Sequence, residues 1–190
     1  RNTAATGLER HNHTTPIGET GLPVVSTLQQ MRKLDEMLAE NDTVLLIKLH
    51  PFQSRDMVHD MEGYSHIRLI EHAAMLEHDI QINQLLGYAD ALISDYSSAA
   101  VDYLVLDRPV AFTLDDMETY GSERGFFWDD VKQWLPGEEL YSFEDFLTFI
   151  EEIIAGNDNG KDRRDSISRL MQKYRDDKNS ERVLRALNIV

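Results

Sequence analysis

Residues 94–98, with the sequence Ser-Asp-Tyr-Ser-Ser, form a polar turn between an apolar run and a segment suited to a helix. The side chains of Ser94, Asp95, Ser97 and Ser98 carry oxygens that can cap the start of that helix. The first N–H groups of a helix have no partner inside it, and the helix dipole adds positive charge there. We therefore expect outward-facing N–H groups and an anion site, with phosphate as the biological ligand. The alternative is an ordinary capped turn without a ligand.

His50 is a second candidate group, because it follows the apolar run 44–49 and precedes Pro51. Proline stops a strand and holds the residue before it in an extended conformation. In open α/β sheets, ligands bind at the carboxyl ends of the strands. His50 is therefore a candidate for binding or catalysis at that edge, and the alternative is a hydrogen-bonded turn residue.

The segment 115–127 is interpreted as an aromatic-rich loop that contains one guanidinium group, that of Arg124. Arginine binds phosphate through two parallel hydrogen bonds. One interpretation of Arg124 is a clamp on a phosphate held at the neighbouring turn. The other is a surface salt bridge with Asp129 or Asp130.

The elements that would position these groups follow from the apolar pattern, which predicts strands at 44–49, 67–70, 91–94 and 110–112. The first run is nearly continuous, which is typical of a strand covered on both faces. Segments with helical spacing alternate with the strands, and this order requires right-handed crossovers and a mainly parallel sheet. The predicted fold class is α/β, a Rossmann-like parallel sheet in chain order flanked by helices. His50 and Ser97 would then share its carboxyl edge.

The remaining segments complete one lobe. Residues 1–27 are polar and contain several glycines and prolines, so they are expected to form a loop region, and residues 28–190 are expected to form the lobe. Its other helices are predicted around 28–38, 82–89, 143–150 and 167–174, with a short one after the turn 176–180. His11 and His13 lack further ligands at metal-binding spacing, so no metal site is expected.

Composition limits the partners. The chain has 190 residues, no cysteine and a formal net charge of −15. This acidity argues against nucleic acid or anionic lipid as the main partner, so an anionic ligand would need a local site. No apolar run approaches the roughly 18 residues that cross a bilayer. Because the chain begins at Arg1 without a signal-peptide pattern, we interpret it as a piece of a longer protein.

Three separated motifs resemble the CDP-glycerol glycerophosphotransferase family, whose members polymerise or prime teichoic acid chains. They are Lys-Leu-His-Pro at 48–51, the stretch 89–98 with Asp102, Tyr103 and Pro109, and Tyr120 with Arg124 and Gly125. They follow the family's order between about residues 44 and 187. The resemblance implies a GT-B architecture, in which this chain is the carboxyl-terminal, nucleotide-binding lobe. The amino-terminal acceptor lobe and the first strand of this lobe would precede Arg1.

The resemblance also implies a reaction. A terminal hydroxyl of the polymer would attack the β-phosphorus of CDP-glycerol and release CMP. His50 is assigned a catalytic role at the phosphates, where it would stabilise charge on the transferring phosphoryl group. The general base would come from the other lobe, so this chain alone would bind its substrate without turning it over. No metal or other cofactor is implied.

The substrate-binding residues that the resemblance implies surround the polar turn. Ser97 and Ser98 are assigned to the pyrophosphate, and Asp95 of the same turn is a further substrate-binding residue. Asp102 stands where related lobes place an acidic residue on the ribose hydroxyls, and Arg124 is a further phosphate contact. The spacing is consistent with these roles, because Asp102 lies one helical turn after the cap.

The implied partners are CDP-glycerol or a related CDP-alditol and a polymer acceptor bound through the other lobe, with no nucleic acid. The implied location is cytoplasmic and peripheral, at the inner face of the cell membrane. Two alternatives remain open: another nucleotide-sugar glycosyltransferase lobe of GT-B type, which the Ser-Ser turn also allows, and a non-catalytic interaction domain with an acidic surface. The motifs do not separate glycerol from ribitol, or priming from extension.

Overall fold

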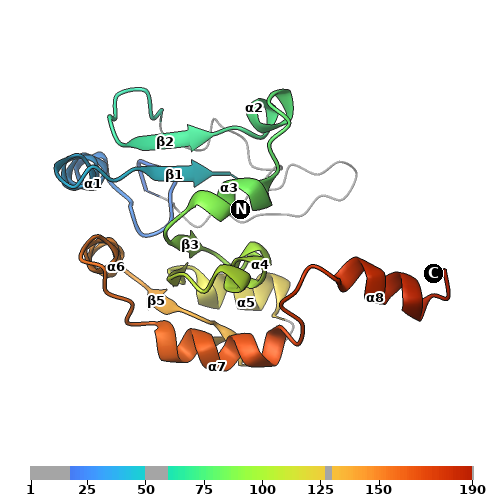
Figure 1. Cartoon of the computed structure of the whole chain (residues 1–190). Helices are drawn as coiled ribbons and strands as arrows, with labels where there is room; N and C mark the ends of the chain where they lie inside the picture. Colours follow the sequence, from blue (N-terminus) through green and yellow to red (C-terminus); the bar gives the residue numbers. More distant parts are fainter. Residues whose placement is uncertain (1–17, 50–59, 127–129, 190) are drawn as a thin grey trace.

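The structure, a computed structural model, describes residues 18–49, 60–126 and 130–189, so His11, His13 and His50 lie outside the described residues. Within these ranges, short parallel strands alternate with helices, which confirms the predicted α/β class (Figure 1). The strands are β1 (Leu45–Lys48), β2 (Ile67–Ile70), β3 (Leu92–Ser94), β4 (Val110–Thr113) and β5 (Glu138–Leu140).

The helices are α1 (Leu28–Glu40), α2 (His72–Glu77), α3 (Ile82–Tyr88), α4 (Ala99–Tyr103), α5 (Met117–Arg124), α6 (Phe143–Ile154), α7 (Lys161–Met171) and α8 (Asn179–Ala186). Two short 3₁₀ segments, η2 (Leu104–Leu106) and η3 (Val131–Trp134), follow α4 and α5. Capping boxes at Thr27 and Ser142 set the starts of α1 and α6. In each, the hydroxyl of the cap residue accepts a hydrogen bond from the N–H of the third helical residue, and the side chain of that residue accepts one from the N–H of the cap residue.

Hydrogen bonds join the strands in two parallel groups. β1 pairs with β2, with Leu45 opposite Ile67, and β4 pairs with both β3 and β5. Figure 1 places β1 between β2 and β3, and Ile47 of β1 and Ile93 of β3 pack against the same core. The prediction of a single sheet in chain order is therefore wrong. The chain leaves β2, passes across β1 through α2 and α3, and enters β3 on the other side of β1. This reversal creates a switch point, and α/β sheets bind ligands outside the carboxyl ends of the strands at such a point.

Strand β5 is absent from the sequence prediction because its residues, Glu-Glu-Leu, contain no apolar run. Its start depends on a close approach of two backbones. A Cβ atom on Gly137 would lie 2.0 Å from the carbonyl oxygen of Val110. Only glycine therefore permits this approach of β5 to β4 without a backbone shift.

Two hydrophobic clusters cover opposite faces of the strands. The larger contains Met31, Leu34 and Leu38 of α1, the inner face of α6, and Ala111 of β4. The smaller packs residues of α3 and α4 against Val110 and Phe112 of the same strand. Since β4 alternates between the two clusters and is buried along its whole length, it is the central strand of this half of the molecule.

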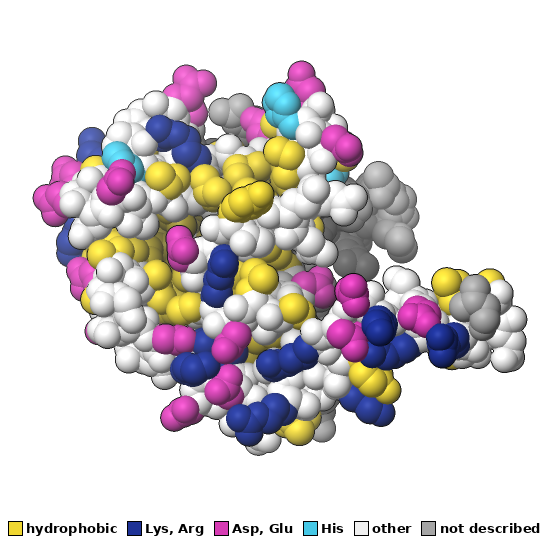
Figure 2. All heavy atoms as spheres, viewed as in Figure 1, with side chains coloured by type: hydrophobic (Ala, Val, Ile, Leu, Met, Phe, Trp, Pro, Cys, Tyr) yellow, Lys and Arg dark blue, Asp and Glu magenta, His cyan; other side chains and the backbone are white. Residues whose placement is uncertain are grey.

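Two predictions of burial fail. Leu46 in β1 is 47% exposed, so this strand is not covered on both faces. α7 ends at Met171, and Leu170 and Tyr174 are 69% and 46% exposed, outside the core in which the predicted helix would place them. Figure 2 shows hydrophobic side chains at the surface near β1 and β2, and again on α8, which projects from the body of the molecule.

Residues 18–27 have no regular structure but pack against the lobe. Leu22, Val24 and Val25 join the larger hydrophobic cluster, and the buried Thr20 hydroxyl donates to the carbonyl of Val25. Among the residues that the structure describes, no helix has the length and apolar character to cross a membrane.

Candidate functional site

The polar turn connects β3 to α4, as the sequence predicts. The Ser97 hydroxyl accepts a hydrogen bond from the N–H of Ala99 (3.3 Å), and its carbonyl accepts one from Ala100 (3.3 Å). The N–H of Val101 donates to the carbonyl of Ser98 (2.9 Å). The expectation of outward-facing N–H groups is therefore wrong for these three residues. Ser98 already has helical dihedral angles, so the first helical turn begins one residue early. The N–H groups of Ala99, Ala100 and Val101 therefore bond to Ser97 and Ser98 instead of facing outward.

The side chains of Ser98 and Asp102 are left available. Ser98 precedes α4 but makes no capping hydrogen bond with its side chain. Asp102 lies four residues later, so the two share one face of the helix. Both residues are exposed, and neither side chain hydrogen-bonds to another described residue. The structure thus brings a hydroxyl and a carboxylate together at the carboxyl end of β3.

Three aromatic rings connect this turn to the segment around Arg124. Tyr96, inside the turn, packs on Tyr120 with ring centroids 4.3 Å apart. Phe126 closes the group, 5.2 Å from Tyr96 and 5.3 Å from Tyr120. Two motifs separated by more than twenty residues therefore lie in direct contact. No local pattern predicts this contact, although the aromatic residues of segment 115–127 are the feature of the sequence that indicates it.

The second motif is helical. Residues 117–124 form α5, which corrects the prediction of a loop over 115–127. Arg124 is the last residue of α5, beside the aromatic group, but its side chain lies outside what the structure describes. Both interpretations of Arg124, phosphate clamp and surface salt bridge, stay predictions, as does the role of His50.

The carboxyl end of β1 supplies a cation that is not among the predicted site residues. Lys48 is the last residue of β1, and its Nζ donates to the carbonyl of Leu49 (3.1 Å). Partial burial lowers the pKa of Lys48 from its ordinary value. Its place in the motif Lys-Leu-His-Pro was the available signal. The switch point between β1 and β3 therefore carries a basic group on one side and the hydroxyl turn on the other.

Asp95, the remaining predicted site residue, directly follows β3 and is half-buried. The neighbouring carbonyl of Ser94 accepts a hydrogen bond from the Thr113 hydroxyl (3.4 Å). This bond links the last residues of β3 and β4, so the turn starts from a fixed point at the carboxyl edge.

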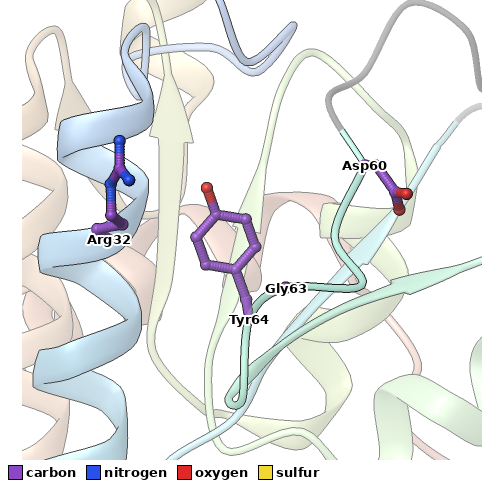
Figure 3. Close-up of a pocket in the computed structure, with 4 residues that line it drawn as sticks. All are labelled: Arg32, Asp60, Gly63 and Tyr64. Atoms are coloured by element: carbon purple, nitrogen blue, oxygen red, sulfur yellow. The ribbon is translucent and has the colours of Figure 1, made fainter.

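A separate cavity of about 370 Å³ lies between α1 and the segment that leads into β2, lined by Arg32, Asp60, Gly63 and Tyr64 (Figure 3). Gly63 and Tyr64 precede β2 and therefore lie toward its amino end. The lining includes none of the predicted site residues, so this cavity is not the site at the polar turn.

The parallel strands, the layers of helices on both faces and the polar turn at a switch point define a Rossmann-like lobe. In lobes of this class, ligands bind outside the carboxyl ends of the strands, here those of β1 and β3. The family model of CDP-Glycerol:Poly(glycerophosphate) glycerophosphotransferase matches residues 24–188. The chain belongs to this family.

Curated relatives agree with this assignment. A teichoic acid ribitol-phosphate primase of Bacillus spizizenii is 27% identical over 158 residues, which cover 83% of this chain and 38% of the relative. A teichoic acid glycerol-phosphate transferase of Staphylococcus aureus is 31% identical over 122 residues, 60% of this chain and 28% of the relative. The chain thus spans well under half the length of these relatives.

Among solved structures, the wall teichoic acid polymerase TagF aligns with a TM-score of 0.47 and 25% sequence identity. The alignment covers 77% of this chain and 38% of the polymerase.

Proposed function

We propose that this chain binds a CDP-activated alditol at the turn between β3 and α4, as the donor lobe of a teichoic acid glycerophosphotransferase of GT-B architecture. The observation that carries the proposal is the meeting of the hydroxyl turn with the Tyr120–Gly125 motif at the carboxyl edge of a parallel sheet. Family membership over residues 24–188 supports the class of donor. The relatives act on both glycerol phosphate and ribitol phosphate, so CDP-glycerol and CDP-ribitol are both candidate donors.

The proposed reaction is transfer of an alditol phosphate to a polymer hydroxyl. The hydroxyl oxygen attacks the β-phosphorus, the bond from that phosphorus to the bridging oxygen breaks, and CMP leaves with the electron pair. The hydroxyl proton passes to a base, which we place in a second lobe outside this chain. Hydroxyl donors such as Ser98 can hydrogen-bond to the phosphate oxygens, and the cationic Lys48 and Arg124 would offset their charge.

Asp102 is proposed to contact the ribose. Its carboxylate shares the exposed face of Ser98, and a carboxylate accepts hydrogen bonds from vicinal hydroxyls while it repels phosphate. The phosphates would therefore lie near Ser97 and Ser98, and the sugar would extend along α4 toward Asp102. This direction separates the two ends of the nucleotide.

Calorimetry with CDP-glycerol, CDP-ribitol, UDP-glucose and CMP tests the donor class. Binding of either CDP-alditol, with no binding of UDP-glucose, is the expected result. Tighter binding of UDP-glucose would favour a nucleotide-sugar glycosyltransferase lobe. No binding of any of the four ligands would favour a non-catalytic interaction domain.

His50 stays a separate prediction. In an assay of CMP release by the active enzyme, His50→Ala is expected to lower kcat and kcat/KM together, because imidazole would act on charge that develops in the transition state. A rise in the donor Kd with unchanged kcat would instead assign His50 to ground-state binding. Normal specific activity with poor expression would make it a structural turn residue.

A further inference from the structure

Tyr96 and the start of α5 are tied together by an unusual use of a helix cap. Asp116 is the N-cap residue of α5, but its side chain makes no capping hydrogen bond to the helix. Its Oδ1 instead accepts a hydrogen bond from the Tyr96 hydroxyl (3.1 Å), and Asp116 is 9% exposed. Aspartate is among the best capping residues, but the Asp116 carboxylate bonds to the polar turn and not to its own helix.

Two glycines shape the other side of the aromatic group. Gly125 ends α5 with φ +69° and ψ 163°, a conformation essentially restricted to glycine, and the chain turns there before Phe126. A Cβ atom on Gly121 would lie 3.1 Å from Cε2 of Phe126, so a larger residue would push that ring away. Gly125 therefore allows the turn that brings Phe126 to Tyr96 and Tyr120, and Gly121 leaves room for the Phe126 ring.

We propose that Tyr96, Tyr120 and Phe126 form a positioning cluster that holds the Ser97–Ser98 turn in its ligand-binding conformation. The inference rests on the proposed function for the identity of the ligand, but not for the coupling between α5 and the turn. Tyr96 directly precedes Ser97, so a ring fixed by two neighbours and by Asp116 restricts the backbone that presents both serines. A turn held in place before binding loses less conformational entropy when the donor arrives.

The cluster also gives the third motif a role that does not depend on the Arg124 side chain. Tyr120 packs against the turn, and Gly125 directs Phe126 back onto it. The positioning residues are thus Tyr96, Tyr120 and Phe126, and none of them needs to touch the reacting phosphate.

Amide hydrogen exchange tests the coupling without any ligand. In the purified protein, Tyr120→Leu is expected to speed exchange at Ala99, Ala100 and Val101 at least tenfold, because their N–H groups report the turn, while α6 exchanges as in the wild type. Tyr120→Phe keeps the ring and should restore slow exchange. Tyr88→Leu is the matched control, because Tyr88 is 88% exposed.

Calorimetry on the same variants then measures their affinity for CDP-glycerol or CDP-ribitol, whichever of the two the wild type binds. We expect about tenfold weaker binding for Tyr120→Leu and wild-type affinity for Tyr120→Phe and Tyr88→Leu. If Tyr120→Leu does not fold, Tyr96→Phe decides, because it removes only the hydroxyl that bonds Asp116 and should speed exchange at the same three amides.

Unchanged exchange at these amides in the folded variants would overturn the positioning cluster. Exchange that rises equally in α6 would also overturn it, because the rings would then be general core residues. Faster exchange in the turn together with no binding of any CDP-alditol by the wild type would support the coupling and reject the proposed function.

Discussion

The two ends of the β3–β4–β5 sheet are built from different chemistry. At the amino end of β4, the Arg164 side chain is 1% exposed and donates two hydrogen bonds to the Asp158 carboxylate (2.8 and 2.6 Å) and one each to the carboxylate and the carbonyl of Asp107 (3.1 and 3.3 Å). At the carboxyl end of β3, Ser98 and Asp102 are exposed and bonded to no other described side chain. One end is closed by buried charge, and the other presents polar groups to solvent.

The amino end has a second set of hydrogen bonds, which join side chains to backbone carbonyls. The Tyr103 hydroxyl and the Arg108 guanidinium both donate to the carbonyl of Ala89 (2.7 and 2.6 Å), and Arg108 also reaches the carbonyl of Gly87 (3.1 Å). These bonds satisfy carbonyls at the end of α3, which the helix leaves unpaired. They fix the chain where it enters β3.

This difference shows how the lobe can keep a polar turn ready for a ligand. Exposed polar groups that are bonded to no other side chain contribute little to the free energy of folding. The contacts that stabilise the backbone around them must therefore lie elsewhere in the molecule. Here the buried ion pairs and carbonyl contacts lie at the opposite end of the same strands. Substitutions at the two ends should therefore have separable effects on stability and on binding.

The largest expected effect is at the buried arginine. Arg164→Met should lower the free energy of unfolding by about 3 kcal/mol, because it leaves Asp158 without its cation and removes one of the two cations bound to Asp107. Denaturant titration measures this loss. Arg169→Met, at an exposed arginine of the same helix, should change it little. Weaker donor binding by folded Arg164→Met would contradict the separation of the two ends.

The opposite pattern is expected at the turn. Ser97→Ala combined with Ser98→Ala should weaken binding of the CDP-alditol by about 1–3 kcal/mol, the loss of hydrogen bonds to a charged group. The free energy of unfolding should fall by no more than the contribution of one helix cap, because of the two serines only Ser97 uses its hydroxyl to bond the backbone. Calorimetry and thermal unfolding measure the two effects. Unchanged affinity would favour a plain capped turn, and Ser166→Ala, at an exposed serine of α7, controls for loss of a hydroxyl.

A smaller effect is expected at Tyr103, and it depends on pH. Burial raises the pKa of Tyr103 from 10.0 to about 12. Since the folded pKa lies above the unfolded one, this group's contribution to stability is complete below pH 10 and is lost as the pH rises toward 12. The free energy of unfolding of Tyr103→Phe should be about 1 kcal/mol lower than that of the wild type at neutral pH, and it should fall less steeply as the pH rises from 10 toward 12. Tyr88→Phe, at an exposed ring, should keep the wild-type slope.

The smallest effect concerns Asp107 at acid pH. The hydrogen bond from Lys161, with further help from Arg164, lowers the pKa of Asp107 below its ordinary 3.8. Its contribution is therefore present above this value and is lost as the pH falls through the lowered pKa. The free energy of unfolding of Asp107→Asn should therefore decrease less steeply at acid pH than that of the wild type. Asp177→Asn is the control, and an equal slope for both variants would show that Asp107 contributes nothing.

Local sequence patterns predict the class of fold, the starts of α1, α3 and α6 and the location of the turn. The apolar spacing of Met31, Leu34 and Leu38 predicts the buried face of α1, and the run before Ser94 predicts β3. These features depend on local periodicity and on backbone preferences of neighbouring residues, which a sequence displays directly. The family resemblance also rests on such local motifs, and the match over residues 24–188 confirms it.

Tertiary structure alone decided the strand order, strand β5 and the meeting of Tyr96 with Tyr120 and Phe126. Each depends on contacts between residues far apart in the chain, which no local pattern specifies. Gly137 and Gly121 illustrate this, because a glycine in a sequence does not reveal which distant carbonyl or ring will approach it. The same holds for the N–H groups of the turn, since the early helical dihedral angles of Ser98 decided which donors remain for a ligand.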